Sequence, residues 1–427
     1  MIKRCYKDYG SVFTIPVFHK RLTYLIGPEA QEIFFKASDD VLSQQEVYDF
    51  MAPVFGRNIV YDAPKKKRQV QFQATANGLR TARLKAYVSK IEDETRKYLK
   101  NEWGESGSVD LLKALSELTI LTASRCLHGE DVRQHIFKEI QELYHDLDHG
   151  VTPLTVFWPT APTEAHRKRD AARKKMYELF TKVIEERRAN PERSDGTDIL
   201  NLYMNIKYKD GSAITMEQVT GMLIALLFAG QHTSCITSTW TSLFIANDQN
   251  ILDRILEEQK KVLGGDMSKK GLVYDHLNQM ELLHNCMREA LRMCPTFIMI
   301  LRRAEQDIPI KADGRDFVIP KGDFVVVSPT VSMRLKQSFT DPDTFDPDRY
   351  AEPREEHKKP YAYMGFGGGL HSCMGQNFAF VQVKTILSIL LREYEIERVE
   401  PGMPAIGYEE MVVGPVGDCT IRYKKRA

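Results

Sequence analysis

A glycine-rich segment that contains a cysteine is the part of this sequence best suited to chemistry. It spans residues 366–375, reads FGGGLHSCMG, and is followed by an apolar run. Three consecutive glycines let a backbone turn tightly and approach a flat ligand closely. Cys373 stands near the start of the predicted helix that follows, where the helix dipole favours the thiolate form that ligates metals. A metal-ligating thiolate is therefore one interpretation of this segment.

Two other interpretations are a phosphate-cradling loop and an inert buried cysteine. A dinucleotide-binding fingerprint would need a glycine where Leu370 or Ser372 stands, and no parallel-sheet pattern surrounds the segment. The Gly-Lys-Ser/Thr ending of a P-loop is missing as well. Of the two ligand-binding interpretations, the metal site is therefore favoured over the phosphate loop.

A glutamate and an arginine, Glu289 and Arg292, stand three residues apart on a predicted helix that Pro295 would end. Such a pair is commonly a surface ion pair worth a few tenths of a kcal/mol. A second arginine, Arg349, lies in the segment 345–350, shortly before the cysteine loop. Taken alone, the Glu289–Arg292 pair is therefore interpreted as an ordinary pair on the helix surface.

A long apolar helix is predicted to begin with a capping box of Thr215 and Gln218 and to run to Asn247. Its middle reads AGQHTS, with His232 and Thr233 interrupting the apolar run. Small residues there let another group approach, and hydroxyls that bond to preceding carbonyls bend a helix. His232 and Thr233 could also be polar residues that are satisfied within the core.

The segment from Tyr48 to Asp62 combines a short amphipathic turn, a proline, a glycine-hinged loop and a closing aromatic residue, Tyr61. Taken by itself, it could be a connector that lines the core. Its sequence, YDFMAPVFGRNIVYD, is rich in aromatic and aliphatic side chains that could also line an apolar pocket.

Together these segments resemble the cytochrome P450 superfamily and, within it, the sterol 14α-demethylases. The superfamily's haem-binding loop has the same spacing of Phe, Gly, a basic residue, Cys and Gly. His371 stands where most members carry arginine, and His232 stands where most carry an acidic residue. Histidine at both places, and the segment 48–62, are similar to the sterol 14α-demethylases. The similarity extends from about Lys7 to Tyr423.

The resemblance implies that the protein binds haem b, with Cys373 as the axial ligand of the iron. It also implies that Thr233 and His232 deliver protons during oxygen activation. The other residues that it places against haem are Tyr48, Tyr61, Ala229, Arg302, Phe366, Gly367 and His371.

The resemblance further implies that Glu289, Arg292 and Arg349 form a buried structural network that fixes the cysteine loop. Removing one member would then prevent haem incorporation rather than slow catalysis. The residues that the resemblance places along a sterol pocket are Phe50, Met51, Phe55, Tyr61, Ala225, Ala229, Phe297, Met299, Met411 and Val412.

The implied reaction removes the 14α-methyl group of a sterol precursor in three steps that use O2 and NADPH and release formate. A separate NADPH-cytochrome P450 reductase would supply the electrons, since no flavin or nicotinamide site is apparent in the sequence. Phe50 stands where members that prefer obtusifoliol-like C4-monomethyl sterols over lanosterol carry phenylalanine. Azole inhibitors would ligate the iron.

Two alternatives stay open at this point. One is a cytochrome P450 that acts on another lipid or on a xenobiotic, and the other is a haem-binding or sterol-binding protein without turnover. The histidine at 232 and the segment 48–62 weigh against the first alternative.

The periodicity of apolar residues predicts a mainly α protein with a small β region, and the resemblance makes this the cytochrome P450 fold. No repeat or linker divides the chain, so we expect a single catalytic domain over residues 1–427. The expected elements are a hairpin over 10–26, helices over 28–36, 81–101, 110–127, 132–147, 164–189, 196–206, 215–247, 250–263 and 280–293, strands within 317–327 and a last helix over 374–392.

The composition excludes some classes of function. Fifty-nine basic and 58 acidic residues leave a net charge of +1, which indicates no nucleic-acid partner. Seven scattered cysteines without a CxxC pair argue against a disulfide framework and a structural zinc site.

The sequence also gives an expectation about membranes. No uninterrupted run reaches the roughly 18 to 20 apolar residues of a membrane span. The resemblance implies an N-terminal membrane anchor that is absent from this chain. It also implies contact with the membrane surface and location at the endoplasmic reticulum membrane, with the catalytic domain facing the cytosol.

Overall fold

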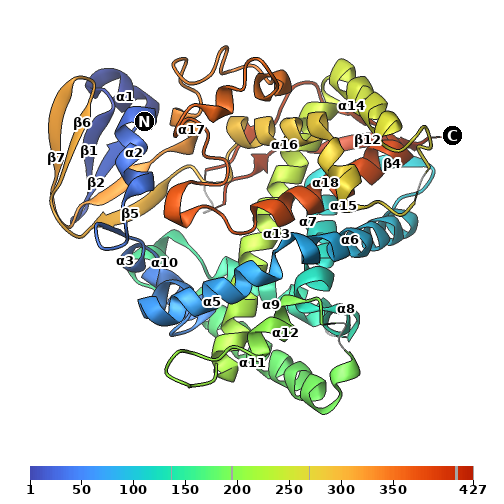
Figure 1. Cartoon of the computed structure of the whole chain (residues 1–427), viewed down its shortest axis with the longest axis horizontal. Coiled ribbons are helices and arrows are strands. Elements are labelled where there is room, and N and C mark those ends of the chain that lie inside the picture. Colours follow the sequence, from blue (N-terminus) through green and yellow to red (C-terminus); the bar gives the residue numbers. More distant parts are fainter. Residues whose placement is uncertain (136, 194–195, 269, 409–411, 427) are drawn as a thin grey trace.

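The computed structural model of the chain describes residues 1–135, 137–193, 196–268, 270–408 and 412–426. Helices dominate it, and strands gather in two places, one near the N-terminus and one near the C-terminus (Figure 1). A long helix, α13 (Met216–Ala246), runs through the middle of the molecule. The mainly α architecture with small β regions that we predicted is confirmed.

The helices that precede α13 include several that the sequence pattern did not predict, among them α1, α3, α4, α5 and α10. In α1, the residues Ile2, Cys5 and Tyr6 share one face and pack against the apolar cluster of the first hairpin. These helices are α1 (Ile2–Tyr9), α2 (Pro28–Lys36), α3 (Gln45–Tyr48), α4 (Ala52–Phe55), α5 (Lys65–Gly78), α6 (Thr81–Glu102), α7 (Leu111–Ala123), α8 (Glu130–His135), α9 (Phe137–His149), α10 (Pro153–Phe157), α11 (Glu164–Ala189) and α12 (Ile199–Met204).

The helices that follow α13 in the chain include three that contact it, α14, α16 and α18, and the last of these comes directly after the cysteine loop. The last one begins at Gln376, two residues later than predicted, because the loop after Cys373 still turns. They are α14 (Gln249–Val262), α15 (Tyr274–Gln279), α16 (Glu281–Met293), α17 (Pro329–Ser332) and α18 (Gln376–Glu393).

Helix α13 begins at the predicted capping box. The Thr215 hydroxyl accepts from the Gln218 N–H at 3.2 Å, and the Gln218 side-chain oxygen accepts from the Thr215 N–H at 3.1 Å. By length and composition α13 could cross a membrane, although its apolar run is interrupted at residues 230–234, as the sequence indicated. Within the described residues, however, 67% of its most apolar window is buried. The small polar residues that break its apolar run face the neighbouring helices α7, α11, α16 and α18.

The strands form small sheets at the two edges of the molecule (Figure 1). The predicted first hairpin, β1 (Val12–Val17) and β2 (Lys20–Leu25), belongs to a mixed sheet of order β1-β2-β8-β5-β3 with β8 (Phe324–Val327), β5 (Ile300–Ala304) and β3 (Leu42–Ser43). The two strands predicted within 317–327 exist but lie in different sheets, since β7 (Arg315–Ile319) pairs with β6 (Ile308–Ala312). In the remaining sheets, β12 (Thr420–Lys425) lies between β4 (Ser106–Asp110) and β9 (Tyr394–Arg398), and β10 (Ala405–Ile406) pairs with β11 (Pro415–Val416).

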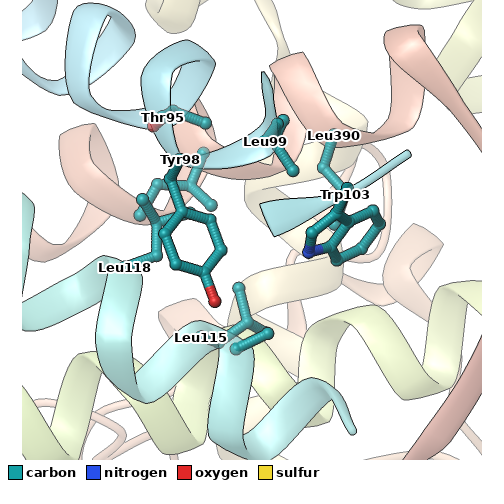
Figure 2. Close-up of a pocket in the computed structure, with 9 residues that line it drawn as sticks. Thr95, Tyr98, Leu99, Trp103, Leu115, Leu118 and Leu390 are labelled. Carbon is teal, nitrogen blue, oxygen red and sulfur yellow. The ribbon is translucent and has the colours of Figure 1, made fainter. Parts of the chain in front are cut away.

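The helices α6, α7 and α18 enclose a small cavity of about 10 Å³ in the core (Figure 2). Leu115, Leu118 and Leu390 line it, together with the ring of Trp103. The Tyr98 hydroxyl donates to Glu117 at 2.9 Å, so this polar group is already satisfied.

Candidate active site

Cys373 lies at the end of the glycine-rich loop, just before α18. Its N–H donates to the Phe366 carbonyl at 2.9 Å, which closes the loop on itself. The side chain is exposed. Nevertheless, burial by the surrounding protein raises the pKa of the thiol, although the N–H groups of Gly375 and Gln376 lower it. The backbone groups at the start of the helix therefore favour the thiolate, as expected, while desolvation opposes them and outweighs them in the protein alone.

The glycines of the loop have different roles. A Cβ on Gly369 would lie 1.8 Å from the Phe35 carbonyl oxygen, and one on Gly368 would lie 2.9 Å from the Phe35 ring. These two glycines therefore let the loop lie directly on α2. Gly367 has a φ of +71° and open space beside it, since its nearest such neighbour is the His371 oxygen at 3.7 Å. The predicted close approach of a flat ligand thus concerns Gly367 in particular.

His371 is held by an acidic residue that the sequence did not reveal. Its Nε2 lies 2.6 Å from an oxygen of Asp39, and Arg68 of α5 donates to the other Asp39 oxygen at 2.8 Å. All three side chains are largely buried, with exposed fractions of 12% to 16%. No local pattern could have found Asp39, because its partners are 29 and 332 residues away along the chain.

Arg302 on β5 brings a guanidinium to the same region. It donates to the Phe34 carbonyl at 3.0 Å and lies 4.5 Å over the Phe34 ring. Burial lowers the pKa of Arg302 to about 10, while Asp39 raises it. Among the described residues, the buried Nε of Arg302 has no hydrogen-bond partner. A buried N–H donor without an acceptor destabilises the fold. The Arg302 Nε–H is therefore suited to donate to an anionic ligand.

The rings of Tyr48 and Tyr61 stack, with 4.6 Å between their centroids. Burial raises the pKa of Tyr61, and the proximity of Tyr48 and Cys373 raises it further. Burial also raises the pKa of Tyr48, while the Leu301 backbone and Arg302 lower it. The structure therefore brings both predicted tyrosines together with the cysteine loop and with β5.

The middle of α13 presents small residues and a hydroxyl. Thr233 donates to the Ala229 carbonyl at 2.7 Å, and Thr237 donates to the Thr233 carbonyl at 2.6 Å. A Cβ on Gly230 would have no neighbour within 4 Å, and Ala229 is exposed although most of the helix is buried. The predicted backward hydrogen bond is present, and the helix has room for a ligand here.

His232, the neighbour of Thr233, faces α9. Its Nε2 lies 3.2 Å from an oxygen of Asp148, and its ring lies 5.6 Å from that of Tyr144. Asp148 is half-buried, with 33% of its side chain exposed, so it also reaches solvent. The sequence did not indicate Asp148, because no spacing rule connects position 148 with position 232.

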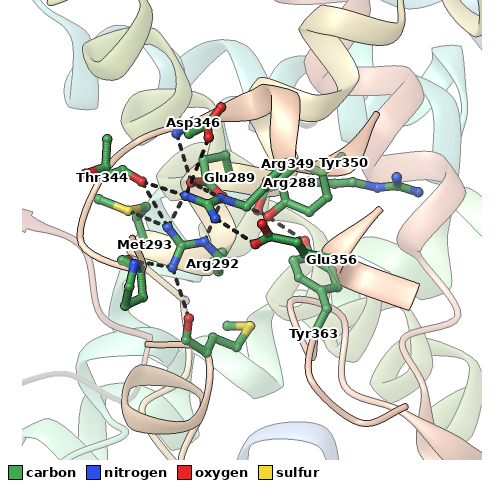
Figure 3. Close-up of polar contacts among 12 residues, drawn as sticks. Arg288, Glu289, Arg292, Met293, Thr344, Asp346, Arg349, Tyr350, Glu356 and Tyr363 are labelled. Atoms are coloured by element: carbon green, nitrogen blue, oxygen red, sulfur yellow. Dashed lines mark hydrogen bonds and ion pairs between the residues drawn. The ribbon is translucent and has the colours of Figure 1, made fainter. Parts of the chain in front are cut away.

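Glu289, Arg292 and Arg349 meet in one buried network (Figure 3). Arg292 donates to both Glu289 oxygens, at 2.7 and 2.8 Å, and Arg349 donates to one of them at 2.9 Å. The side chains of all three are fully buried. Arg292 also donates to the carbonyls of Met333 and Pro342, so this helix residue holds two loop segments.

Two further residues that sequence reasoning missed complete this network. The Tyr350 hydroxyl donates to Glu289 at 2.9 Å, and Arg349 donates to Glu356 at 2.8 Å. Two glutamates therefore balance two arginines, as a buried cluster of charges requires. Figure 3 shows that the second glutamate comes from the same loop as Arg349.

Several predicted pocket residues lie around α13. The ring of Phe55 meets that of Phe228 on α13 edge-on, with 5.7 Å between centroids. Met51 is buried in the same cluster, while Phe50 and Ala225 are partly buried against it.

The other predicted pocket residues lie near the end of α16. Phe297 is 39% exposed. Val412 is brought close to it because the Val413 N–H donates to the Thr296 carbonyl at 2.9 Å. The sulfur of Met299 accepts from the Tyr24 hydroxyl at 3.3 Å, which places this side chain against the first sheet. Met411 lies outside the described residues.

Comparison with known proteins decides the family. The cytochrome P450 family profile matches residues 1–417. A sterol 14-demethylase of Arabidopsis thaliana is 45% identical over 100% of this chain and 87% of its own length. The chain belongs to the cytochrome P450 family and, within it, to the sterol 14-demethylases.

An obtusifoliol 14-alpha demethylase of Triticum aestivum is 43% identical over 100% of this chain and 93% of its own length. Among solved structures, retinoic acid-bound cyanobacterial CYP120A1 superposes with a TM-score of 0.86 over 99% of this chain and 94% of its own. Its 20% identity supports the shared fold alone.

Cytochrome P450 proteins bind haem, and the residues present fit this group. Haem b carries an iron, a flat macrocycle and two carboxylates. Cys373 offers an exposed thiol, Gly230 has open space beside it, and Gly367 has only the His371 oxygen within 4 Å, at 3.7 Å. Arg302 offers a buried donor without a protein partner among the described residues.

Proposed function

We propose that this protein is a sterol 14α-demethylase that prefers obtusifoliol-like C4-monomethyl sterols. The observation that carries the proposal is the 45% identity, over the whole chain, with a sterol 14-demethylase. The preference for a single C4 methyl group rests on Phe50 and on the 43% identity with an obtusifoliol 14-alpha demethylase. The catalytic unit comprises residues 1–427 as a single domain.

Haem b would be held between α13 and the cysteine loop. Cys373 would bind the iron, and Tyr48, Tyr61, Arg302 and His371 would bind the carboxylates. Ala229, Phe366 and Gly367 would contact the macrocycle. Bound through a thiolate, haem supplies the activation of O2 that oxidation of the 14α-methyl group requires.

Thr233 and His232 would move protons during that activation. The Thr233 hydroxyl is already oriented by its bond to the Ala229 carbonyl at 2.7 Å. His232 Nε2 lies 3.2 Å from an Asp148 oxygen but forms no hydrogen bond among the described residues, so a rotation of either side chain would have to complete this contact before a proton passes to Asp148 and from its exposed part to water. A side chain that takes part in proton transfer has to lie within hydrogen-bond reach, directly or through one water.

The pocket would select its substrate mainly by shape, because a sterol precursor is nearly all hydrocarbon. The side chains proposed to line it are apolar apart from one hydroxyl. They are Phe50, Met51, Phe55, Tyr61, Ala225, Ala229, Phe297, Met299, Met411 and Val412.

A separate NADPH-cytochrome P450 reductase would supply electrons for the three oxidation steps. The enzyme would work at the endoplasmic reticulum membrane with its catalytic domain facing the cytosol. There the membrane would hold both the reductase and the apolar substrate.

The purified protein, reduced with dithionite and treated with carbon monoxide, tests this function together with a turnover assay. We expect the absorption band typical of a thiolate-ligated haem, and formate from obtusifoliol when reductase and NADPH are added. The Cys373→Ala variant is the control and should lack that band, since no other soft anionic ligand stands nearby. A spin-state shift with obtusifoliol but no formate would indicate a binding protein. A thiolate band without any response to sterols would indicate a P450 with another substrate.

A further inference from the structure

The loop between α4 and α5 contains a valine in a strained backbone conformation. Asn58 and Val60 have φ values of +61° and +48°. Asparagine visits this left-handed region fairly often, but a branched side chain such as that of valine is a genuine outlier there. The strained residue directly precedes Tyr61, so the conformation of Val60 sets where Tyr61 lies.

Gln71 of α5 holds both sides of this strained residue. Its side-chain oxygen accepts from the Val60 N–H at 3.2 Å, and its amide nitrogen donates to the Asn58 carbonyl at 2.9 Å. Gln71 is only 1% exposed, so water does not compete for these bonds. A strained conformation persists only when its surroundings fix it, and Gln71 supplies that constraint.

Tyr208 links Gln71 to the start of α13. Its hydroxyl accepts from the Gln71 amide at 3.0 Å and donates to the side-chain oxygen of Gln218 at 3.2 Å. The amide of Gln218 reaches the Asn58 carbonyl at 3.4 Å. The turn after α12 holds Tyr208 in place, since its N–H donates to the Ser212 carbonyl at 2.9 Å.

A glycine on α13 lets the loop sit close to that helix. A Cβ on Gly221 would lie 2.0 Å from the Phe55 carbonyl oxygen and 2.1 Å from a methyl carbon of Ile59. Ile59 is 1% exposed and packs against α13 at Gly221, so it holds the loop on this helix. The loop is thus fixed on two sides, by close packing on α13 and by hydrogen bonds from Gln71.

We propose that Gln71, Tyr208 and Gln218 form a clamp that keeps Val60 strained and thereby positions Tyr61 toward the ligand site. Gln71 is then a positioning residue for ligand binding, which rests on the proposed role of Tyr61 in lining the pocket. Without the clamp, Val60 relaxes to a common backbone conformation and Tyr61 turns away from Tyr48. The pocket wall formed by the stacked pair is lost.

The Gln71→Leu variant tests the clamp, and Gln69→Leu is its matched control on the same helix. Gln69 is exposed, whereas Gln71 is buried. Both haem-loaded variants and the parent are titrated with obtusifoliol, with a bulky aryl-azole and with unsubstituted imidazole, and the spectral shift is recorded. We expect Gln71→Leu to weaken the sterol and the aryl-azole roughly 10-fold, as a loss of about 1.4 kcal/mol does. Imidazole is too small to reach Tyr61, so its affinity should not change.

Relief of the strain provides a second test. Glycine adopts a positive φ without steric cost, so the clamp matters less when residue 60 is glycine. The double variant Gln71→Leu with Val60→Gly should therefore recover at least about threefold of the lost affinity. If it binds no better than Gln71→Leu alone, the strain at Val60 is not what Gln71 controls, and the proposal fails.

If the Gln71→Leu variant does not bind haem, the Tyr208→Phe variant tests the clamp instead, because it removes only the hydroxyl that links Gln71 to Gln218. Equal affinities of the parent and Tyr208→Phe for the aryl-azole would overturn the clamp. A parent protein that binds aryl-azole but not sterol would overturn the proposed substrate class instead. The two failures are distinguishable because the aryl-azole reports on the clamp without any sterol.

Discussion

At the scale of single residues, the candidate site depends on partners that lie far apart in the sequence. Cys373, His232 and Thr233 could be predicted because local spacing marks them. Asp39 and Asp148 could not, because an aspartate carries no local sign that it will meet a histidine hundreds or dozens of residues away. The packing of the helices determines which charged side chains meet. Sequence periodicity predicts where helices lie along the chain, but it does not predict which helices pack together.

Thr233→Ala should leave sterol binding unchanged and lower the product formed per NADPH consumed, since the proton relay and not the pocket is altered. General acid–base groups contribute about 10²- to 10⁴-fold, so a loss of coupling of at least about tenfold is expected. Thr237→Ala is the control, because Thr237 makes the same backward bond one turn later in the helix. NADPH oxidation and formate release are measured together. Equal coupling in both variants would remove Thr233 from the relay.

Phe50→Leu should shift preference from obtusifoliol toward lanosterol. A rigid ring at this place takes the room that a second C4 methyl group needs, and a packed wall does not expand without strain. One methyl group in an apolar pocket discriminates by about 10- to 200-fold. Competition between the two sterols measures the ratio of specificity constants in the parent and in the variant. A ratio near one in the parent would contradict the proposed role of Phe50.

At the scale of elements, periodicity predicted most of the long helices, the highly charged α11 among them, and missed α5. α5 begins with four basic residues, Lys65-Lys66-Lys67-Arg68. Because of this run, the few apolar residues of α5 do not show a clear helical periodicity in the sequence. In the sheet of β4, β12 and β9, residues 106–110 pair with residues 420–425. A local sequence pattern cannot predict such a pairing, because the two strands are far apart in the chain. The buried network of Glu289, Arg292 and Arg349 could be predicted only from the resemblance to the cytochrome P450 superfamily. In the sequence alone, Glu289 and Arg292 look like an ion pair on a helix surface.

Arg349→Ala should produce protein that is mostly free of haem. The change removes from Glu289 and Glu356 the one arginine that contacts both, and breaking a buried ion pair by removing one partner costs about 3–5 kcal/mol. Arg354→Ala is a fitting control, because Arg354 comes from the same loop and also contacts Glu356 but is 36% exposed. That variant should lose at most about 1 kcal/mol. Haem content per protein and thermal unfolding are compared, and equal haem loading in both variants would refute a structural role for Arg349.

At the scale of the whole molecule, the site joins segments from most of the chain: the region around residue 39, α5, α13, β5 and the loop before α18. A ligand that binds there should stabilise the entire fold, because it binds the native state alone. An azole at 100 times its dissociation constant adds about 2.7 kcal/mol to the free energy of unfolding. With an unfolding entropy of about 2.1 cal/mol/K per residue, a chain of this length should gain about 3 °C in Tm.

The azole's ring nitrogen should account for most of that gain, since it would bind the iron that Cys373 would hold. An analogue with carbon in place of that nitrogen should raise Tm by less than about 1 °C at the same concentration, because it keeps only the apolar contacts. All scans are run at one heating rate, since large proteins commonly unfold irreversibly and their midpoints then depend on the rate. An equal rise with both compounds would mean that binding does not involve the iron, and the assignment of the ligand site between α13 and the Cys373 loop would have to be abandoned.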